Sequence, residues 1–328
     1  MPSADLSTHQ TVKAEESGLA DVHRPPLVVI LGPTAAGKTE IAIQLAERLE
    51  GEIVSADSRL FYRGMDIGTA KPALAEQVRV PHHLIDVVNP DEVWSLARFQ
   101  QEARRVIGSI HNRGRLPFLV GGTGQYVRAV IQGWDVPAVE PDARLRSALE
   151  AWAYDVGQAG LHARLAVLDR PAAERIDPRN LRRTIRALEV VLTTGRRFSD
   201  LRQSGPSAYR LLLIGLIRPR QELYARVDAR IAAMMEAGFV AEVEALLKKG
   251  YSPELPPLSA IGYKEIIAYL QGVISLEEAV DQIKRATRIF VRRQANWFKP
   301  DDPQIHWFQV GDHTVDEIEA TIRSWRLD

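Results

Sequence analysis

Short apolar runs alternate with amphipathic stretches from residue 27 onward. Between the apolar runs, hydrophobic positions recur at helical spacing in residues 39–49, 95–112 and 125–133. The alternation predicts an α/β fold in which helices flank a parallel sheet. The strands that it predicts are LVVIL (27–31), EIVSA (52–56), LPFLV (116–120) and RLLLIGLI (210–217), and we expect QIHWFQV (304–310) to return as an edge strand.

The stretch from residue 136 to residue 203 breaks this pattern. Alanine, leucine and arginine dominate it, strand-like runs vanish, and four prolines separate what read as short helices. We interpret it as a mainly helical insertion that divides a core of two parts, 27–135 and 204–328. The first 26 residues are polar and mixed in charge, and we expect them to form a disordered tail.

The composition excludes several kinds of site and location but does not identify an activity. The 42 basic and 42 acidic residues cancel, so a polyanionic partner would have to meet a local basic patch. Cysteine is absent, which excludes disulfides and thiolate chemistry, and the eight histidines do not fall at a metal-ligand spacing. No run is long enough for a signal peptide or a membrane span, so we expect a cytoplasmic protein with no membrane association.

A phosphate-binding motif lies between the first predicted strand and the helix that follows. The segment GPTAAGKT satisfies G-x-x-x-x-G-K-[ST] in the strand-to-helix context that the motif requires. Its backbone N–H groups and its lysine can hold phosphates, and its last hydroxyl can hold Mg²⁺. The predicted phosphate-binding residues are Gly32, Pro33, Thr34, Ala35, Ala36, Gly37, Lys38 and Thr39, with Thr39 as the candidate metal ligand.

The phosphate-binding segment 32–39, called the phosphate grip below, does not by itself identify the reaction. Nucleotide hydrolases usually carry a carboxylate after an apolar strand to help hold Mg²⁺, whereas residues 116–120 run into Gly-Gly-Thr-Gly. Asp57 directly follows the second predicted strand, and the carboxyl ends of parallel strands line the ligand crevice. We therefore predict that Asp57 acts as a base on an acceptor, although a helix cap or an exposed turn are simpler roles for it. Thr123 reaches the same edge, where its hydroxyl orients a polar group or merely stabilises the turn.

Seven motifs in order closely resemble those of the tRNA dimethylallyltransferases, also called tRNA isopentenyltransferases. They are GPTAAGKT, SADSRLFY, GMDIGTAKP, HHLIDV, VGGTGQY, RRTIRALEV and AIGYKE, and the resemblance extends from residue 32 to about residue 297. It implies transfer of a dimethylallyl group from its diphosphate to N6 of adenosine 37, next to the tRNA anticodon. Pyrophosphate would then be the leaving group, with Mg²⁺ as cofactor and the tRNA anticodon stem-loop as partner.

The resemblance also implies roles for particular residues. Asp57 would be the catalytic base and Thr123 would help to place it. A tRNA-binding surface would comprise Asp57, Ser58, Arg59, Leu60, Thr123, Arg146, Arg182, Arg183, Thr184, Ile185 and Arg186. This chain differs from the family's usual motifs at two places. The family frequently has glutamine where this chain has Leu60. The segment VRRQANWFK (291–299) stands where the family commonly has a lysine and a Thr-Trp pair.

Three other functions fit part of the pattern. A small-molecule kinase would use the same phosphate grip with Asp57 as its base, and it would consume ATP. A prenyltransferase acting on free adenine nucleotides would not require the insertion or the basic C-terminal half. A non-enzymatic RNA-binding module would leave the grip beside Asp57 unexplained. We expect the transferase to be a monomer.

Overall fold

The computed structural model describes residues 24–136, 142–202 and 205–327. These residues divide into two compact units. Unit 1 comprises 24–94, 102–127 and 207–327, and unit 2 comprises 95–101, 128–136, 142–202 and 205–206. The tail that we expected lies outside the described residues except for 24–26, and Pro26 is already the first residue of a strand.

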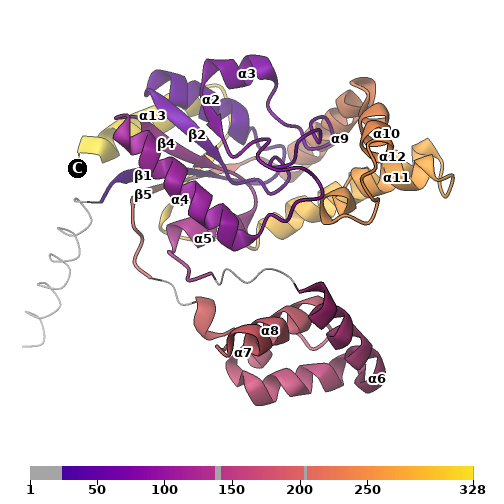
Figure 1. The fold of residues 1–328 in the computed structure, drawn as a ribbon. Helices are drawn as coiled ribbons and strands as arrows, with labels where there is room; N and C mark the ends of the chain where they lie inside the picture. The colour runs from indigo at the N-terminus through magenta and orange to yellow at the C-terminus, as the bar shows by residue number, and fades with distance from the viewer. Residues whose placement is uncertain (1–23, 137–141, 203–204, 328) are drawn as a thin grey trace, which may run out of the picture. The chain divides into compact units, whose positions relative to one another are not determined.

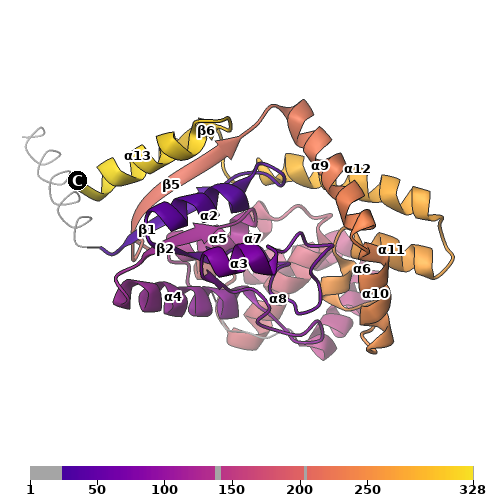
Figure 2. The same ribbon diagram turned by 90° about the horizontal axis from the view of Figure 1, so that it is seen from above.

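Unit 1 is built on a six-stranded sheet in which every pair of neighbouring strands is parallel (Figures 1 and 2). The strand order is β3-β2-β4-β1-β5-β6. This result confirms the α/β fold class, the four buried strands and the edge strand that the sequence predicts. The strands are β1 (Pro26–Leu31), β2 (Gly51–Ser55), β3 (His82–His83), β4 (Leu116–Val120), β5 (Arg210–Ile217) and β6 (Ile305–Gln309).

The apolar sequence of β1 suits its position in the interior of the sheet. Leu27, Val28, Val29, Ile30 and Leu31 are all 0% exposed, as expected of a strand covered on both faces. Helices α2 and α13 lie over one face of the sheet, and α4 and α5 lie along the other (Figures 1 and 2). Their bounds are α2 (Lys38–Arg48), α3 (Leu74–Arg79), α4 (Leu96–Asn112), α5 (Gly124–Ile131) and α13 (Thr314–Leu327).

Four more helices of unit 1 pack on one another beyond β5 (Figure 1). They are α9 (Arg220–Glu236), α10 (Phe239–Lys248), α11 (Tyr263–Leu270) and α12 (Leu276–Gln294). The predicted capping box opens α12, where Ser275 N–H donates to Glu278 Oε2 (2.8 Å) and Glu278 N–H donates to Ser275 Oγ (3.2 Å). No helix in the described parts of the chain combines the length and the apolar character needed to cross a bilayer.

Unit 2 is helical and has its own hydrophobic core. Leu149, Leu161 and Leu165 pack with Ile176 and Leu188, and each is at most 3% exposed. Its main helices are α6 (Ala143–Leu168), α7 (Arg170–Arg175) and α8 (Leu181–Thr194). The span of α6 covers 26 residues, but Gly157, with φ 76° and ψ 160°, breaks it into two shorter helices, which agrees with the expectation of short helices.

Candidate active site

The carboxyl ends of β1, β2 and β4 meet at one edge of the sheet, because these strands are parallel neighbours. The ladder continues past the strands: Ala56 N–H donates to Val120 O (2.8 Å), and Gly121 N–H donates to Ile30 O (3.2 Å). A Cβ on Gly121 would lie 2.5 Å from Ala56 O, so this close approach of two backbones requires glycine. The phosphate grip, Asp57 and Thr123 therefore emerge side by side.

The loop from Gly32 to Gly37 joins β1 to α2 and forms the predicted grip. Gly32 has a φ of 148°, and a Cβ there would lie 2.8 Å from Leu216 O. Gly37 is the left-handed N-cap of α2, and no side chain caps that helix end. Uncapped N–H groups at a helix N-terminus favour anions, so the loop has the geometry of a phosphate site. Thr34 is an exception within the motif, because its N–H already donates to Gln294 Oε1 (2.8 Å).

Lys38 begins α2 with its ammonium held back against the loop. Its Nζ donates to Pro33 O at 2.8 Å. The pKa of Lys38 is lowered to about 8, mainly because burial disfavours its charged form; the negative charge of Asp57 opposes this shift, and the positive charge of Arg230 adds to it. The side chain is therefore protonated below about pH 8 and neutral above it in the ligand-free protein.

We expect this titration to show in diphosphate binding. Phosphate groups have their last pKa near 6, so a prenyl diphosphate stays fully charged above pH 7 while Lys38 loses its proton. The affinity for dimethylallyl diphosphate should fall as the pH rises through about 8, and binding above pH 8 should take up a proton. Isothermal titration calorimetry from pH 7 to 9.5, in buffers of different ionisation enthalpy, measures both quantities. Lys38→Arg should remove the pH dependence, and a flat profile in the wild type would contradict the assignment.

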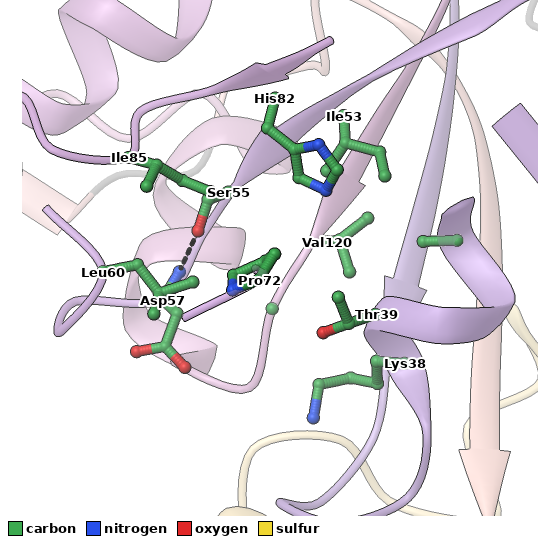
Figure 3. Close-up of a pocket in the computed structure, with 12 residues that line it drawn as sticks. Lys38, Thr39, Ile53, Ser55, Asp57, Leu60, Pro72, His82, Ile85 and Val120 are labelled. Carbon is green, nitrogen blue, oxygen red and sulfur yellow. Dashed lines mark hydrogen bonds between the residues drawn. The ribbon is translucent and has the colours of Figure 1, made fainter. Parts of the chain in front are cut away.

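A small cavity of about 50 Å³ separates the grip from the end of β2 (Figure 3). Lys38 and Thr39 come from α2, and Asp57 follows β2, with its carboxylate and the Lys38 amine reaching the same side of the view (Figure 3). Leu60, Pro72 and Ile85 form an apolar part of the wall. The cavity thus combines a cation, a carboxylate and an apolar surface.

Asp57 is held by local hydrogen bonds. Its N–H donates to Ser55 Oγ (3.3 Å; Figure 3), and its Oδ1 accepts the N–H of Arg59 (3.0 Å). The second bond is the kind of turn contact that the simpler structural role predicts. Asp57 therefore stabilises a turn and also lies beside Lys38 at the cavity. Because one carboxylate oxygen is used by the turn, the side chain is held at the cavity in a fixed orientation.

Thr123 joins the end of β4 to the segment after β2. Its Oγ1 accepts the N–H of Ser58 at 3.4 Å, which connects the Gly-Gly-Thr-Gly turn to the residue after Asp57. Arg59 extends away from the cavity, and its Nη1 donates to Pro256 O (3.4 Å). The structure thus brings Asp57, Ser58 and Thr123 together, whereas the Arg59 guanidinium lies against the loop before α11.

Arginines that follow β5 or lie on α9 contact the phosphate grip, although the sequence analysis did not include them among its site residues. Arg218 Nε donates to Ala36 O (3.0 Å), and Arg226 Nε donates to Ala35 O (2.8 Å). Arg230 lies one helical turn beyond Arg226 and interacts electrostatically with both Lys38 and Asp57. The i, i+4 spacing of Arg226 and Arg230 on α9 is the signal that could have identified them.

Gln294, at the end of α12, bridges the two loops of the site. Its Oε1 accepts the Thr34 N–H (2.8 Å), its Nε2 donates to Gly122 O (3.1 Å), and the residue is 9% exposed. Gly122 leaves room for this contact, because a Cβ there would lie 2.5 Å from Gln294 Nε2. Nothing in the local sequence distinguishes this glutamine from others on the helix.

We expect Gln294→Leu to weaken dimethylallyl diphosphate binding roughly threefold to tenfold, because two partly buried loop groups lose their partner and the grip loses its fixed shape. Calorimetric titration of the variant measures the change. Gln282→Leu makes the same substitution at an exposed position of α12 and should bind normally. Equal affinity of the two variants would show that the bridge does not support the grip.

Glu242 of α10, another residue that the sequence analysis did not identify, holds the GMDIGTAKP segment. Its carboxylate accepts the N–H groups of Asp66 (2.9 Å), Ile67 (2.6 Å) and Gly68 (3.1 Å), and also the Tyr263 hydroxyl (2.6 Å). The same segment ends at Pro72, which lines the cavity. Glu242 therefore explains the motif physically, since the turn must present three successive N–H groups to one carboxylate.

The predicted RNA-contact residues of the insertion lie on α6 and α8. Arg146, Arg182 and Arg186 line a groove of about 530 Å³ together with Glu150, Leu181 and Ile185. Arg183 is exposed on the same helix. Thr184, in contrast, is 0% exposed and packs inside unit 2, so its side chain cannot contribute to an RNA-binding surface.

Oxygen atoms are the candidate metal ligands. Thr39, Ser55 and Asp57 line the cavity beside the grip, and Mg²⁺ prefers such hard ligands together with substrate phosphates. Within the described ranges, no three His, Asp or Glu side chains gather into a metal-binding cluster. The donor set therefore fits Mg²⁺ held partly by a bound diphosphate, and not by a protein cage.

Comparisons with known proteins agree on one family. A sequence model described as IPP transferase matches residues 60–301, more than half of the chain. The tRNA dimethylallyltransferase of Roseiflexus sp. (strain RS-1) is 53% identical over 274 residues, which are 84% of this chain and 90% of the relative. That of Thermomicrobium roseum is 48% identical over 287 residues, 88% of this chain and 87% of the relative.

Solved structures show the same relationship. The tRNA isopentenylpyrophosphate transferase of Bacillus halodurans superposes with a TM-score of 0.69 at 43% identity and covers 93% of this chain and 97% of its own. A eukaryotic dimethylallyltransferase acting on tRNA superposes with a TM-score of 0.75 at 27% identity, covering 92% and 77%. The chain therefore belongs to the IPP transferase family, which its sequence motifs, its sheet and these relatives all identify.

Proposed function

We propose that this protein transfers a dimethylallyl group from dimethylallyl diphosphate to N6 of adenosine 37 in tRNA. The observation that carries the proposal is that Lys38 and Thr39 of the phosphate grip and Asp57 line the same cavity. A diphosphate leaving group and an acceptor amine must meet at such a place. The relatives named as acting on tRNA support the choice of acceptor.

The donor binds through its two phosphates. As the allylic C–O bond breaks, negative charge develops on pyrophosphate, and the N–H groups at the start of α2 together with Lys38 stabilise it. Arg226 fixes the loop from outside by its bond to Ala35 O. The pyrophosphate leaves without being hydrolysed, which explains why a carboxylate of the hydrolase type is not needed after β4.

The acceptor loses one proton as the new N–C bond forms. Asp57 takes that proton from N6, whose acidity rises steeply as it becomes alkylated. The bond from Arg59 N–H to Asp57 Oδ1 keeps the carboxylate at the cavity, and Thr123 holds the adjacent Ser58 in place. Asp57 therefore acts as the base, and Thr123 acts through the backbone of the segment that carries it.

Mg²⁺ is the cofactor that this donor set fits. Thr39 would hold it through its hydroxyl beside the diphosphate, where the ion neutralises charge on the leaving group. Residues from unit 2 would meet the anticodon stem-loop. Arg146, Arg182, Arg183 and Arg186 supply positive charge there, which suits contacts to phosphates that carry no sequence information.

Acceptor choice tests the proposal. The full chain, Mg²⁺ and dimethylallyl diphosphate are incubated with an anticodon stem-loop that carries A37, the same stem-loop with G37, or AMP, and pyrophosphate release is measured. We expect release with the A37 stem-loop alone. Release with AMP at a similar rate would instead support the free-nucleotide prenyltransferase, and release with G37 would exclude N6 of that nucleotide as the acceptor.

A further inference from the structure

Glu189 of α8 is a fully buried carboxylate in the middle of an RNA-facing unit. It is 0% exposed, and a buried charge is costly unless several hydrogen bonds compensate for it. Four N–H groups supply this compensation. Oε1 accepts Asp142 N–H and Arg146 Nε, both at 2.9 Å, and Oε2 accepts Arg146 Nη2 at 2.9 Å and Arg186 Nη1 at 2.6 Å.

These bonds fix guanidinium groups at the wall of the groove described above. Arg146 makes a two-pronged contact, which sets the plane of its guanidinium, and Arg186 is held one turn before Glu189 on the same helix. Both side chains remain partly exposed, at 37% and 30%, so each is anchored at one edge while another part of it reaches solvent. Leu181 and Ile185 are apolar residues that line the same groove.

The charge of Glu189 persists at neutral pH. Burial by itself would raise the pKa of Glu189, but the hydrogen bonds from Arg146, Arg186 and Asp142 N–H outweigh it and hold the pKa below its usual value. A permanent negative charge beneath a basic groove opposes the approach of a polyanion. Glu189 therefore favours RNA binding only if the gain in affinity from orienting the two arginines exceeds the loss in affinity from its negative charge.

We propose that Glu189 is a positioning residue for RNA recognition, which holds Arg146 and Arg186 in the orientation in which they meet the phosphates of the anticodon loop. The inference rests on the proposed function and deepens it, because it identifies the feature of unit 2 that makes its arginines selective for one RNA shape. A screening role and a positioning role predict opposite changes in RNA affinity when the charge of Glu189 is removed. If Glu189 only screened charge, its neutralisation would strengthen RNA binding.

Two substitutions that remove the same charge from the same groove separate these roles. Glu150 also lines the groove but is exposed and makes none of the four bonds to Glu189. In the full chain, E189Q should weaken binding of the anticodon stem-loop about tenfold, whereas E150Q should leave it unchanged or strengthen it. Fluorescence anisotropy at several salt concentrations measures the dissociation constants. Stronger binding by E189Q, matching that of E150Q, would overturn the inference.

The remaining variants guard against a trivial loss of folding. Arg146→Lys keeps the charge and leaves Glu189 in place, yet it cannot make both prongs of the contact, so we expect it to weaken RNA binding as well. E189Q combined with Arg146→Ala and Arg186→Ala should bind no more weakly than the two arginine substitutions alone. A further loss in the triple variant, or full affinity in Arg146→Lys, would contradict positioning.

Kinetics distinguish this inference from the proposed function. E189Q should raise KM for tRNA while kcat at saturating tRNA and the affinity for dimethylallyl diphosphate stay unchanged, since the reacting groups lie in unit 1. If Arg146→Ala and Arg186→Ala leave stem-loop binding intact while prenyl transfer proceeds, the inference and this contact surface are wrong although the activity stands. Absence of prenyl transfer by the wild type would instead reject the function.

Discussion

Asp57→Asn is expected to lower kcat for prenyl transfer by about 10²-fold or more while dimethylallyl diphosphate and tRNA still bind. Asparagine retains a carbonyl oxygen that can accept the Arg59 N–H, so the turn at the cavity should survive. It cannot take a proton from N6, which is the property that the substitution removes. Single-turnover kinetics with saturating donor and tRNA measures the rate of the chemical step directly.

A matched substitution controls for the loss of one negative charge. Asp91→Asn changes an exposed acid of unit 1 and should transfer the prenyl group at the wild-type rate. Near-normal single-turnover kinetics in Asp57→Asn would remove Asp57 from the role of base. The proton would then have to leave N6 by another route, and the bond to Arg59 would be the whole function of the side chain.

Lys38→Met is expected to reduce kcat/KM for dimethylallyl diphosphate by about 10²- to 10³-fold. The methionine fills a similar volume but offers no positive charge to the pyrophosphate as the C–O bond breaks, and removal of one such donor typically has an effect of this size. Part of the loss should appear in kcat, because the leaving group carries more charge in the transition state than in the bound donor. Steady-state kinetics over a range of donor concentrations separates the two parts.

The comparison for this variant is Lys248→Met, on the exposed side of α10. It removes one lysine charge far along the chain from the grip and should leave kcat/KM unchanged. If Lys38→Met lost only affinity and kept its kcat, Lys38 would bind the donor without stabilising its departure. If neither quantity changed, the diphosphate would have to bind elsewhere.

Local patterns predict the sheet and the reacting edge because both arise from short segments. β1 and β4 are continuous apolar runs, β2 (GEIVS) has Ile53 and Val54 between polar residues, and the parallel arrangement places the ends of the three strands together. Asp57 could therefore be placed beside the grip from its position after a strand. The same reasoning could not detect that Oδ1 of Asp57 is shared with a turn, since that depends on backbone geometry.

The contacts that the sequence did not reveal all join segments far apart in the chain. Gln294 reaches Thr34 across 260 residues, and Glu242 reaches Asp66 across 176. Neither stands out by residue type, because glutamine and glutamate are ordinary on amphipathic helices. Only the packing of α10 and α12 brings them to the loops. Arg226 and Arg230 were accessible in principle, through their helical spacing, but the chain alone does not say which way α9 faces.

The insertion shows a different limit of sequence interpretation. Resemblance pointed to residues 182–186 as a continuous contact segment, whereas a helix divides such a segment between two faces. Arg182 and Arg183 are exposed, while Thr184 is fully buried. Glu189, which is fully buried, accepts hydrogen bonds from Arg146 and Arg186, and its position in the sequence gives no sign of these contacts.

Nucleoside composition after reaction tests the central claim most directly. The full chain and Mg²⁺ are incubated with bulk tRNA and either dimethylallyl diphosphate or ATP, and the RNA is then digested to nucleosides and analysed by mass spectrometry. We expect adenosine that has gained one dimethylallyl group, with the first donor alone. If no prenylated adenosine forms while ATP is consumed on a small acceptor, the grip belongs to a kinase and the tRNA surface assigned to the insertion is an ordinary solvated face.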